Sequence, residues 1–137
     1  MSEANKAVAQ RWTEEIWNKG NLAAIDELVA TDLVFHLGSN PDLRGHAGLQ
    51  EFAGAFSAAF PDGHFTNDET IAERDKVVQR WTLTGTHKGE WLGVAATGKQ
   101  TSSTGTTTLR IAGGKVAEHW AHWDVLGWLQ QVGGMPS

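Results

Sequence analysis

Histidines are the residues of this 137-residue chain best suited to chemistry near neutral pH, and there are six of them. The ordinary pKa of an imidazole, about 6.5, lets it take and return a proton without large tuning. His36 and His119 both lie in segments with strand character, where a side chain can be aimed into an enclosed space. A histidine near a strand end can instead hydrogen-bond a backbone carbonyl and do no chemistry. For His36 the residue type leaves both roles open.

The segment from Lys115 to Trp123 has the pattern of a strand, so its side chains point alternately to two faces. One face carries His119, Ala121 and Trp123, and the other carries Glu118, Trp120 and His122. One of these faces borders the candidate site. If it is the second face, the acid-base pair becomes His122 with Glu118 or Asp124.

Asp124 directly precedes Val125-Leu-Gly-Trp-Leu129, which has the pattern of a short helix. An aspartate in this position can accept hydrogen bonds from the free amides of the first helical turn, and this favours an N-cap. The alternative is that its carboxylate orients a nearby histidine in a catalytic site.

Aromatic residues indicate what kind of ligand a cavity here would take. Of the seven tryptophans, we expect Trp12, Trp81, Trp91 and Trp123 to approach the cavity, with Trp91 in the Gly89–Gly93 loop near its mouth. Aromatic walls suit flat apolar ligands. Tryptophans also fill the cores of thin folds, so each has a purely structural alternative.

The elements that must position these residues follow from periodicity. Val8, Trp12 and Ile16 recur at helical spacing up to a stop at Gly20, and Asn21 is a candidate N-cap for a short second helix. A strand at 33–37, a turn at 40–42 and a third helix ending at Pro61-Asp-Gly63 follow. Four strands are then predicted at 64–73, 76–87, 99–111 and 115–123, with a closing helix at 125–132. Helices followed by a strand meander indicate one α+β domain over residues 1–137.

Composition excludes several classes of function. A net charge of −5 with scattered basic residues argues against a nucleic-acid partner. The chain has no cysteine, and His119 and His122, three apart on a strand, point to opposite sides, so we expect no metal site. No phosphate-binding glycine motif is present, and we expect no cofactor. No apolar run could span a membrane or serve as a signal peptide, so we expect no membrane partner and a cytoplasmic location.

Short motifs along the whole chain carry a family resemblance. They are Trp17-Asn-Lys-Gly-Asn-Leu22, Arg44-Gly45, Phe60-Pro-Asp62, Gly85-Thr-His-Lys-Gly-Glu-Trp-Leu-Gly93, Thr97-Gly-Lys99, Gly114-Lys-Val116, Trp120 to Asp124 and Leu129-Gln-Gln-Val-Gly133. The sequence resembles the SnoaL-like polyketide cyclases, which share a cone-shaped fold with nuclear transport factor 2, ketosteroid isomerase and limonene epoxide hydrolase. The resemblance implies a curved antiparallel sheet wrapped around the N-terminal helices, a homodimer, and a small hydrophobic ligand such as a polyketide, terpenoid or steroid.

The resemblance also implies roles for particular positions. His36 falls near the general base of ketosteroid isomerase, and the face with His119, Ala121 and Trp123 falls inside the cone. We therefore expect His36 and His119 to face a common space. The catalytic aspartate of the aldol cyclases, however, falls at Ala121, which has no carboxylate.

Two hydrogen-bond donors of the relatives are also replaced. The donor on the preceding strand falls at Thr107, and the tyrosine of the isomerase falls at Thr13 or Trp12. The resemblance thus implies a cofactor-independent lyase, isomerase or cyclase that acts on a hydrophobic carbonyl compound, with His36 or His119 as base. Two alternatives stay open: a binding protein that has lost the family's carboxylate, and an interaction module that uses Glu118, Trp120 and His122.

Overall fold

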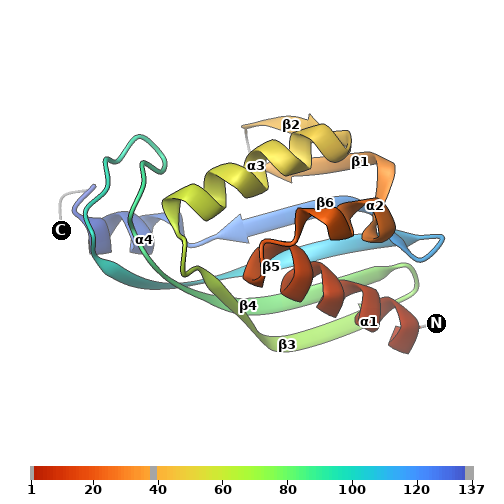
Figure 1. Ribbon diagram of the computed structural model, residues 1–137. Coiled ribbons are helices and arrows are strands. Elements are labelled where there is room, and N and C mark those ends of the chain that lie inside the picture. The colour runs from red at the N-terminus through yellow and green to blue at the C-terminus, as the bar shows by residue number, and fades with distance from the viewer. Residues whose placement is uncertain (1, 38–39, 135–137) are drawn as a thin grey trace.

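The computed structural model describes residues 2–37 and 40–134, and it shows helices packed on one side of a curved sheet (Figure 1). The helical elements are α1 (Ser2–Arg11), the π-helical η1 (Trp12–Asn18), the 3-10 turn η2 (Leu22–Ala24), α2 (Ile25–Leu28), α3 (Gly45–Ala59) and α4 (Val125–Val132). The strands are β1 (Val29–Leu37), β2 (Asn40–Arg44), β3 (His64–Glu73), β4 (Lys76–Thr86), β5 (Gln100–Ala112) and β6 (Lys115–Trp123).

The six strands form one sheet in the order β2-β1-β6-β5-β4-β3. Neighbouring strands are antiparallel except β1 and β6, which run parallel. In Figure 1, α1 lies across the β3 and β4 end of the sheet, and α3 lies across the β1 and β6 end. The opposite, outer face of the sheet carries no helix of the described chain.

Two apolar clusters join the helices to the sheet. The first holds Trp12, Ile16, Leu33, Leu49 and Leu109 among others, and it fills the space beneath α1 and α3. The second is centred on Phe56, Phe60, Trp81 and Trp128 and lies toward α4. No helix in the described ranges is long and apolar enough to cross a membrane.

The predicted α+β architecture with a curved sheet is confirmed, and β3, β6 and α4 have the predicted bounds. The predicted turn at 40–42 is wrong, because these residues begin strand β2. Pro41 suggested a turn, but β2 lies at the edge of the sheet, where a strand tolerates proline. Strand β1 also begins four residues earlier than predicted, at Val29.

Candidate functional site

A cavity of about 410 Å³ lies between η1, α3, the inner face of the sheet and the loop after β4. Most of its lining is aromatic: Trp17, Phe35, Phe52, Phe56, Phe60, Trp81, Trp91 and Trp123. Leu83, Leu92, Ala121 and Val125 complete the apolar part, and His119 and His122 supply imidazoles. The lining among the described residues contains no carboxylate, lysine or arginine. Such a surface favours an uncharged apolar molecule.

The loop over this cavity is held at both ends by backbone hydrogen bonds. The amide of His87 donates to Lys99, and the amide of Gly98 donates back to His87. The amides of Lys88 and Gly89 donate to the carbonyl of Ala59 at the end of α3. A side chain at Gly89 would lie 2.8 Å from the carbonyl oxygen of Ala58, so this close approach requires glycine. The loop is therefore anchored to α3 at its base.

His119 is the buried polar group of the cavity. Its ring stacks on Phe35 with centroids 3.9 Å apart and planes 1° from parallel, and its centroid lies 5.6 Å from that of Trp12. Burial lowers the pKa of His119 to about 3, because the charged form would lose its hydration. Its Nδ1 has no hydrogen-bond partner in the described part of the chain. At neutral pH the site therefore holds an uncharged imidazole.

The expectation that His36 faces the same space as His119 is wrong. In the parallel β1–β6 pair, Phe35 aligns with His119 and His36 aligns with Trp120. Phe35 points into the cavity, so the next residue of the strand points to the outer face. There His36 stacks on Trp120, with ring centroids 5.3 Å apart.

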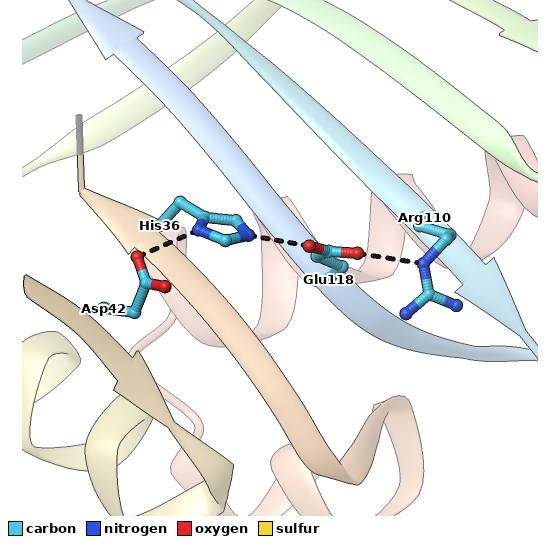
Figure 2. A network of polar contacts seen from close by, with 4 residues as sticks. All are labelled: His36, Asp42, Arg110 and Glu118. Carbon is cyan, nitrogen blue, oxygen red and sulfur yellow. Dashed lines mark hydrogen bonds and ion pairs between the residues drawn. The ribbon is translucent and has the colours of Figure 1, made fainter. Parts of the chain in front are cut away.

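On the outer face His36 belongs to a chain of charged groups, shown in Figure 2. Its Nδ1 lies 2.9 Å from Oδ1 of Asp42 on β2, and its Nε2 lies 2.7 Å from Oε2 of Glu118 on β6. Nε of Arg110 on β5 donates to Oε1 of Glu118 at 3.1 Å. The bond to Glu118, with a further contribution from Asp42, raises the pKa of His36. The bond to His36, with help from Arg110, lowers the pKa of Glu118.

This charged chain should make stability depend on pH through His36. Because the pKa of His36 is raised by folding, its contribution is fully present below the unfolded pKa of about 6.5 and is lost as pH rises through the folded pKa. Glu118 has a lowered pKa, so its contribution is present above about pH 4.3 and is lost as pH falls through the folded pKa. We expect His36→Gln to cost about 1 kcal/mol between about pH 4.5 and 6.5, and less at pH 9.

Urea unfolding of wild type and His36→Gln at a series of pH values measures this difference. His119, whose pKa is lowered by burial, makes the protein less stable as pH falls below about 6.5, and subtracting the two curves removes this effect because it occurs in both proteins. His64→Gln is the matched control, because His64 is an exposed histidine at the start of β3. A difference that stays constant from pH 5 to pH 9 would contradict the assignment of the charged chain.

The other residues predicted for the site divide into two groups. Trp81, Trp91, Ala121 and Trp123 line the cavity with His119. Trp12, Thr13 and Thr107 are buried but are not part of its lining. Each of the three is committed to other parts of the fold.

Trp12 packs edge-on against Trp17, with ring centroids 5.8 Å apart, within the first core cluster. The hydroxyl of Thr13 donates to Ala9 and Gln79, at 3.4 Å each, beside a separate polar groove between α1 and β3. The hydroxyl of Thr107 accepts from the indole N–H of Trp81 at 2.8 Å. Neither threonine borders the aromatic cavity, so neither hydroxyl meets a ligand there directly.

Asp124 is the N-cap of α4, as its position predicted. Its Oδ1 accepts from the amide of Gly127 at 3.0 Å. His87, which directly follows β4, is fully buried, and its Nδ1 lies 3.0 Å from the hydroxyl of Thr97. His46, in the first turn of α3, is partly buried, and its Nε2 lies 2.7 Å from the carbonyl oxygen of Val29.

Sequence reasoning missed the part of the lining that comes from the helices. Phe52, Phe56 and Phe60 have helical spacing, which is typical of the buried face of any helix and does not by itself indicate a cavity. Trp17 follows them into the cavity because the π-helical turn η1 carries it toward α3, with its centroid 5.9 Å from that of Phe52 and 5.7 Å from that of Phe56. The available signal was the clustering of three phenylalanines on one face of this helix, in a chain that also has seven tryptophans. His122, predicted on the outer face, is exposed and also borders the cavity.

Comparison with known proteins places the chain in a family. The model of the SnoaL-like polyketide cyclase family matches residues 7–132. The chain belongs to this family. A protein from Acidithiobacillus ferrooxidans, provisionally described as a polyketide cyclase, is 32% identical with a TM-score of 0.86, and the match covers 99% of each chain. AclR from Streptomyces galilaeus, provisionally described as a hydroxylase, is 29% identical with a TM-score of 0.87, covering 100% of this chain and 85% of AclR.

A more distant structure shows the fold alone. It is a Catenulispora acidiphila protein with a ketosteroid isomerase-like fold, in complex with trimethylamine, and it is 18% identical with a TM-score of 0.78 over 94% of this chain and 93% of its own. No curated protein matches this sequence significantly. The two similar proteins named above carry different reaction names, so similarity of fold leaves the chemistry to the residues of the cavity.

Proposed function

We propose that this SnoaL-like protein is a cofactor-independent enzyme that binds a hydrophobic carbonyl compound and moves a proton next to the carbonyl group. The observation that supports the proposal is the aromatic cavity of about 410 Å³ with one buried, uncharged imidazole, that of His119. A cavity of this size suits a small molecule of two to four rings. Its apolar lining suits the skeleton of a polyketide, terpenoid or steroid.

His119 is proposed as a hydrogen-bond donor to the carbonyl oxygen. When a proton leaves the neighbouring carbon, its electrons move to the oxygen, and an N–H group already in place stabilises the enolate. A neutral imidazole carries one such N–H and can act in this way without gaining a proton. With a pKa of about 3, His119 is a weak base near neutral pH, which argues against the role of base expected from the sequence.

His122 is the base in this proposal. It is the other histidine that borders the cavity; its neighbours Ala121 and Trp123 point inward, so its exposed ring reaches a ligand only by turning in from the end of β6. The proton would pass from carbon to the imidazole of His122 and return to a different carbon, which completes an isomerisation or prepares an aldol cyclisation.

A non-catalytic binding protein is the second candidate, and Ala121 favours it. This residue lines the cavity at the position where the aldol cyclases, by the resemblance, carry their aspartate. An apolar cavity without a carboxylate can hold the same ligands and leave them unchanged.

Proton exchange distinguishes the two candidates. The ketone 2-tetralone is flat and enolisable, and its exchange in D₂O can be followed by NMR with the protein or with free imidazole at the same concentration. An enzyme should exceed free imidazole by about 100-fold. 9-Fluorenone, which cannot enolise, reports binding through tryptophan fluorescence. Binding without faster exchange would identify a binding protein, and no binding of either ketone would favour an interaction module.

A homodimer is also proposed, formed through the outer face of the sheet. The support for it is that no helix of the described chain covers this face, where Trp120 is only partly buried. Dimers bury such faces when the apolar area exceeds what a monomer usually leaves exposed. Sedimentation equilibrium should then give twice the chain mass of 14.8 kDa, and a monomeric mass would refute this assembly.

A further inference from the structure

Three alternate residues of β5, Ser103, Gly105 and Thr107, lie on the inner face of the sheet behind two tryptophans of the cavity. Gly105 pairs with Trp81 of β4 on one side and with Trp123 of β6 on the other. The two tryptophans therefore flank a glycine, at the same level of three neighbouring strands. Each indole then finds its hydrogen-bond partner on β5.

Both indole N–H groups are used by the hydroxyls that flank this glycine. Nε1 of Trp81 donates to Oγ1 of Thr107 at 2.8 Å, and Nε1 of Trp123 donates to Oγ of Ser103 at 2.7 Å. The residues Ser103 and Thr107 are buried, so water does not compete readily for these bonds. Neither residue belongs to the lining of the cavity, whereas both tryptophans do.

The residue between Ser103 and Thr107 has to be a glycine because there is no room for a side chain. A Cβ atom on Gly105 would lie 2.5 Å from Cζ2 of Trp81 and 2.6 Å from the backbone oxygen of His122. The ring of Trp81 thus lies directly against the β5 backbone, in the orientation that lets its N–H reach Thr107. The order Ser103, Gly105, Thr107 supplies one acceptor, one gap and a second acceptor along the same face.

We propose that Ser103 and Thr107 are positioning residues that set the selectivity of the cavity by keeping two indole N–H groups away from the ligand. The wall made by Trp81 and Trp123 then offers ring carbon and no donor. A ligand carbonyl is directed to the imidazole end of the cavity, because it finds no hydrogen bond along this wall. The proposal rests on the part of the proposed function that places a small molecule in the cavity, and it does not require turnover.

Two probes that differ by one carbonyl group test this selectivity. They are fluorene and 9-fluorenone, whose Kd values are measured by tryptophan fluorescence. In Thr107→Val the freed indole can turn its N–H toward the cavity. We expect the preference for the ketone to rise by about tenfold, which corresponds to one added hydrogen bond. Ser103→Ala should act in the same direction through Trp123.

Two further variants separate positioning from general damage to the fold. Thr106→Val is the matched control, because Thr106 lies on the same strand but is exposed on the outer face. This variant should prefer 9-fluorenone over fluorene to the same degree as wild type. Thr107→Ser keeps the hydroxyl and should restore the wild-type preference. If Thr107→Val weakens the binding of both probes equally, the hydroxyl only supports the fold and the proposal is overturned.

If wild type binds neither probe, hydrogen exchange of the indole N–H groups still tests whether Thr107 positions Trp81. NMR of ¹⁵N-labelled ligand-free protein resolves the indole N–H groups, and Trp81→Phe assigns the signal of Trp81. We expect slow exchange at Trp81 in wild type and in Thr106→Val, and exchange at least about tenfold faster in Thr107→Val, since the loss of one hydrogen bond has this magnitude. This result would uphold the positioning role while the proposed function fails. Unchanged exchange in Thr107→Val would overturn the positioning role itself.

Discussion

Replacing His119 with phenylalanine should reduce proton exchange from 2-tetralone by about 100-fold or more, the usual cost of removing a donor to a developing oxyanion. The fold should tolerate the change, because the imidazole is buried, stacks flat on Phe35 and leaves its Nδ1 without a partner. An apolar ring of similar shape in such a site is nearly neutral or stabilising. Binding of fluorene should be preserved, while binding of 9-fluorenone should weaken.

The pH dependence of the wild-type rate gives an independent check on His119. With its pKa lowered to about 3, the imidazole stays neutral from pH 5 to pH 9 and should add no inflection in that range. His64→Phe is the control, since it removes an exposed imidazole outside the cavity. If His119→Phe exchanges protons as fast as wild type, the donor role assigned to His119 is wrong.

Gly105→Ala should be among the most destabilising single substitutions in this chain. The added methyl group would overlap the ring of Trp81 and the backbone oxygen of His122, and the backbone oxygen cannot move without disturbing the β5–β6 pairing. Overpacking of this kind costs about 1–3 kcal/mol, and we expect a value near the upper end. Displacement of the Trp81 ring should also change the near-ultraviolet circular dichroism.

Gly54→Ala is the matched control for this prediction. Gly54 lies within α3, and a Cβ atom there would meet nothing within 4 Å. Alanine should stabilise a helix at such a position by about 0.5–1 kcal/mol, because it restricts the unfolded chain more than glycine does. Urea unfolding of both variants gives the two free energies. If the Gly105→Ala protein is as stable as wild type, the strands beside Gly105 can move apart to accept a methyl group, and the prediction is wrong.

Strands with a clear alternation of apolar and polar residues could be predicted from the sequence. The prediction failed for His36, because the result depended on the face of the sheet to which one side chain points. Local periodicity is enough to give β3, β6 and α4 their bounds. The position of His36 came from a resemblance, and a shift of one residue along a strand moves a side chain to the other face. The alternation of Leu33 and Phe35, both buried, already indicated that His36 points outward.

The candidate site was harder to predict because aromatic residues serve cores and cavities equally well. Trp12 and Trp81 cannot be told apart by residue type, yet Trp12 packs within the first core cluster, whereas Trp81, in the second cluster, also lines the cavity. The difference arises from three-dimensional packing. The indole of Trp81 donates a hydrogen bond to Thr107 on β5, and its ring fits against β5 because position 105 is a glycine. Such a pairing between strands cannot be recognised from local sequence patterns.

The way the loop after β4 is anchored has a consequence for the rate at which ligands enter and leave. Its base is fixed to α3 by the bonds to Ala59, whereas its tip carries Trp91, the exposed Leu92 and Gly93 in a turn closed by the Trp91–Val94 pair. Leu92 has a φ of 51°, a conformation that leucine adopts only at an energetic cost. Opening of the tip would break the edge-on contacts of Trp91 with Phe52, Phe56 and Phe60 and would leave the base of the loop in place. Residence time in the cavity would then be set by a few residues near Trp91, separately from the affinity that the aromatic walls provide.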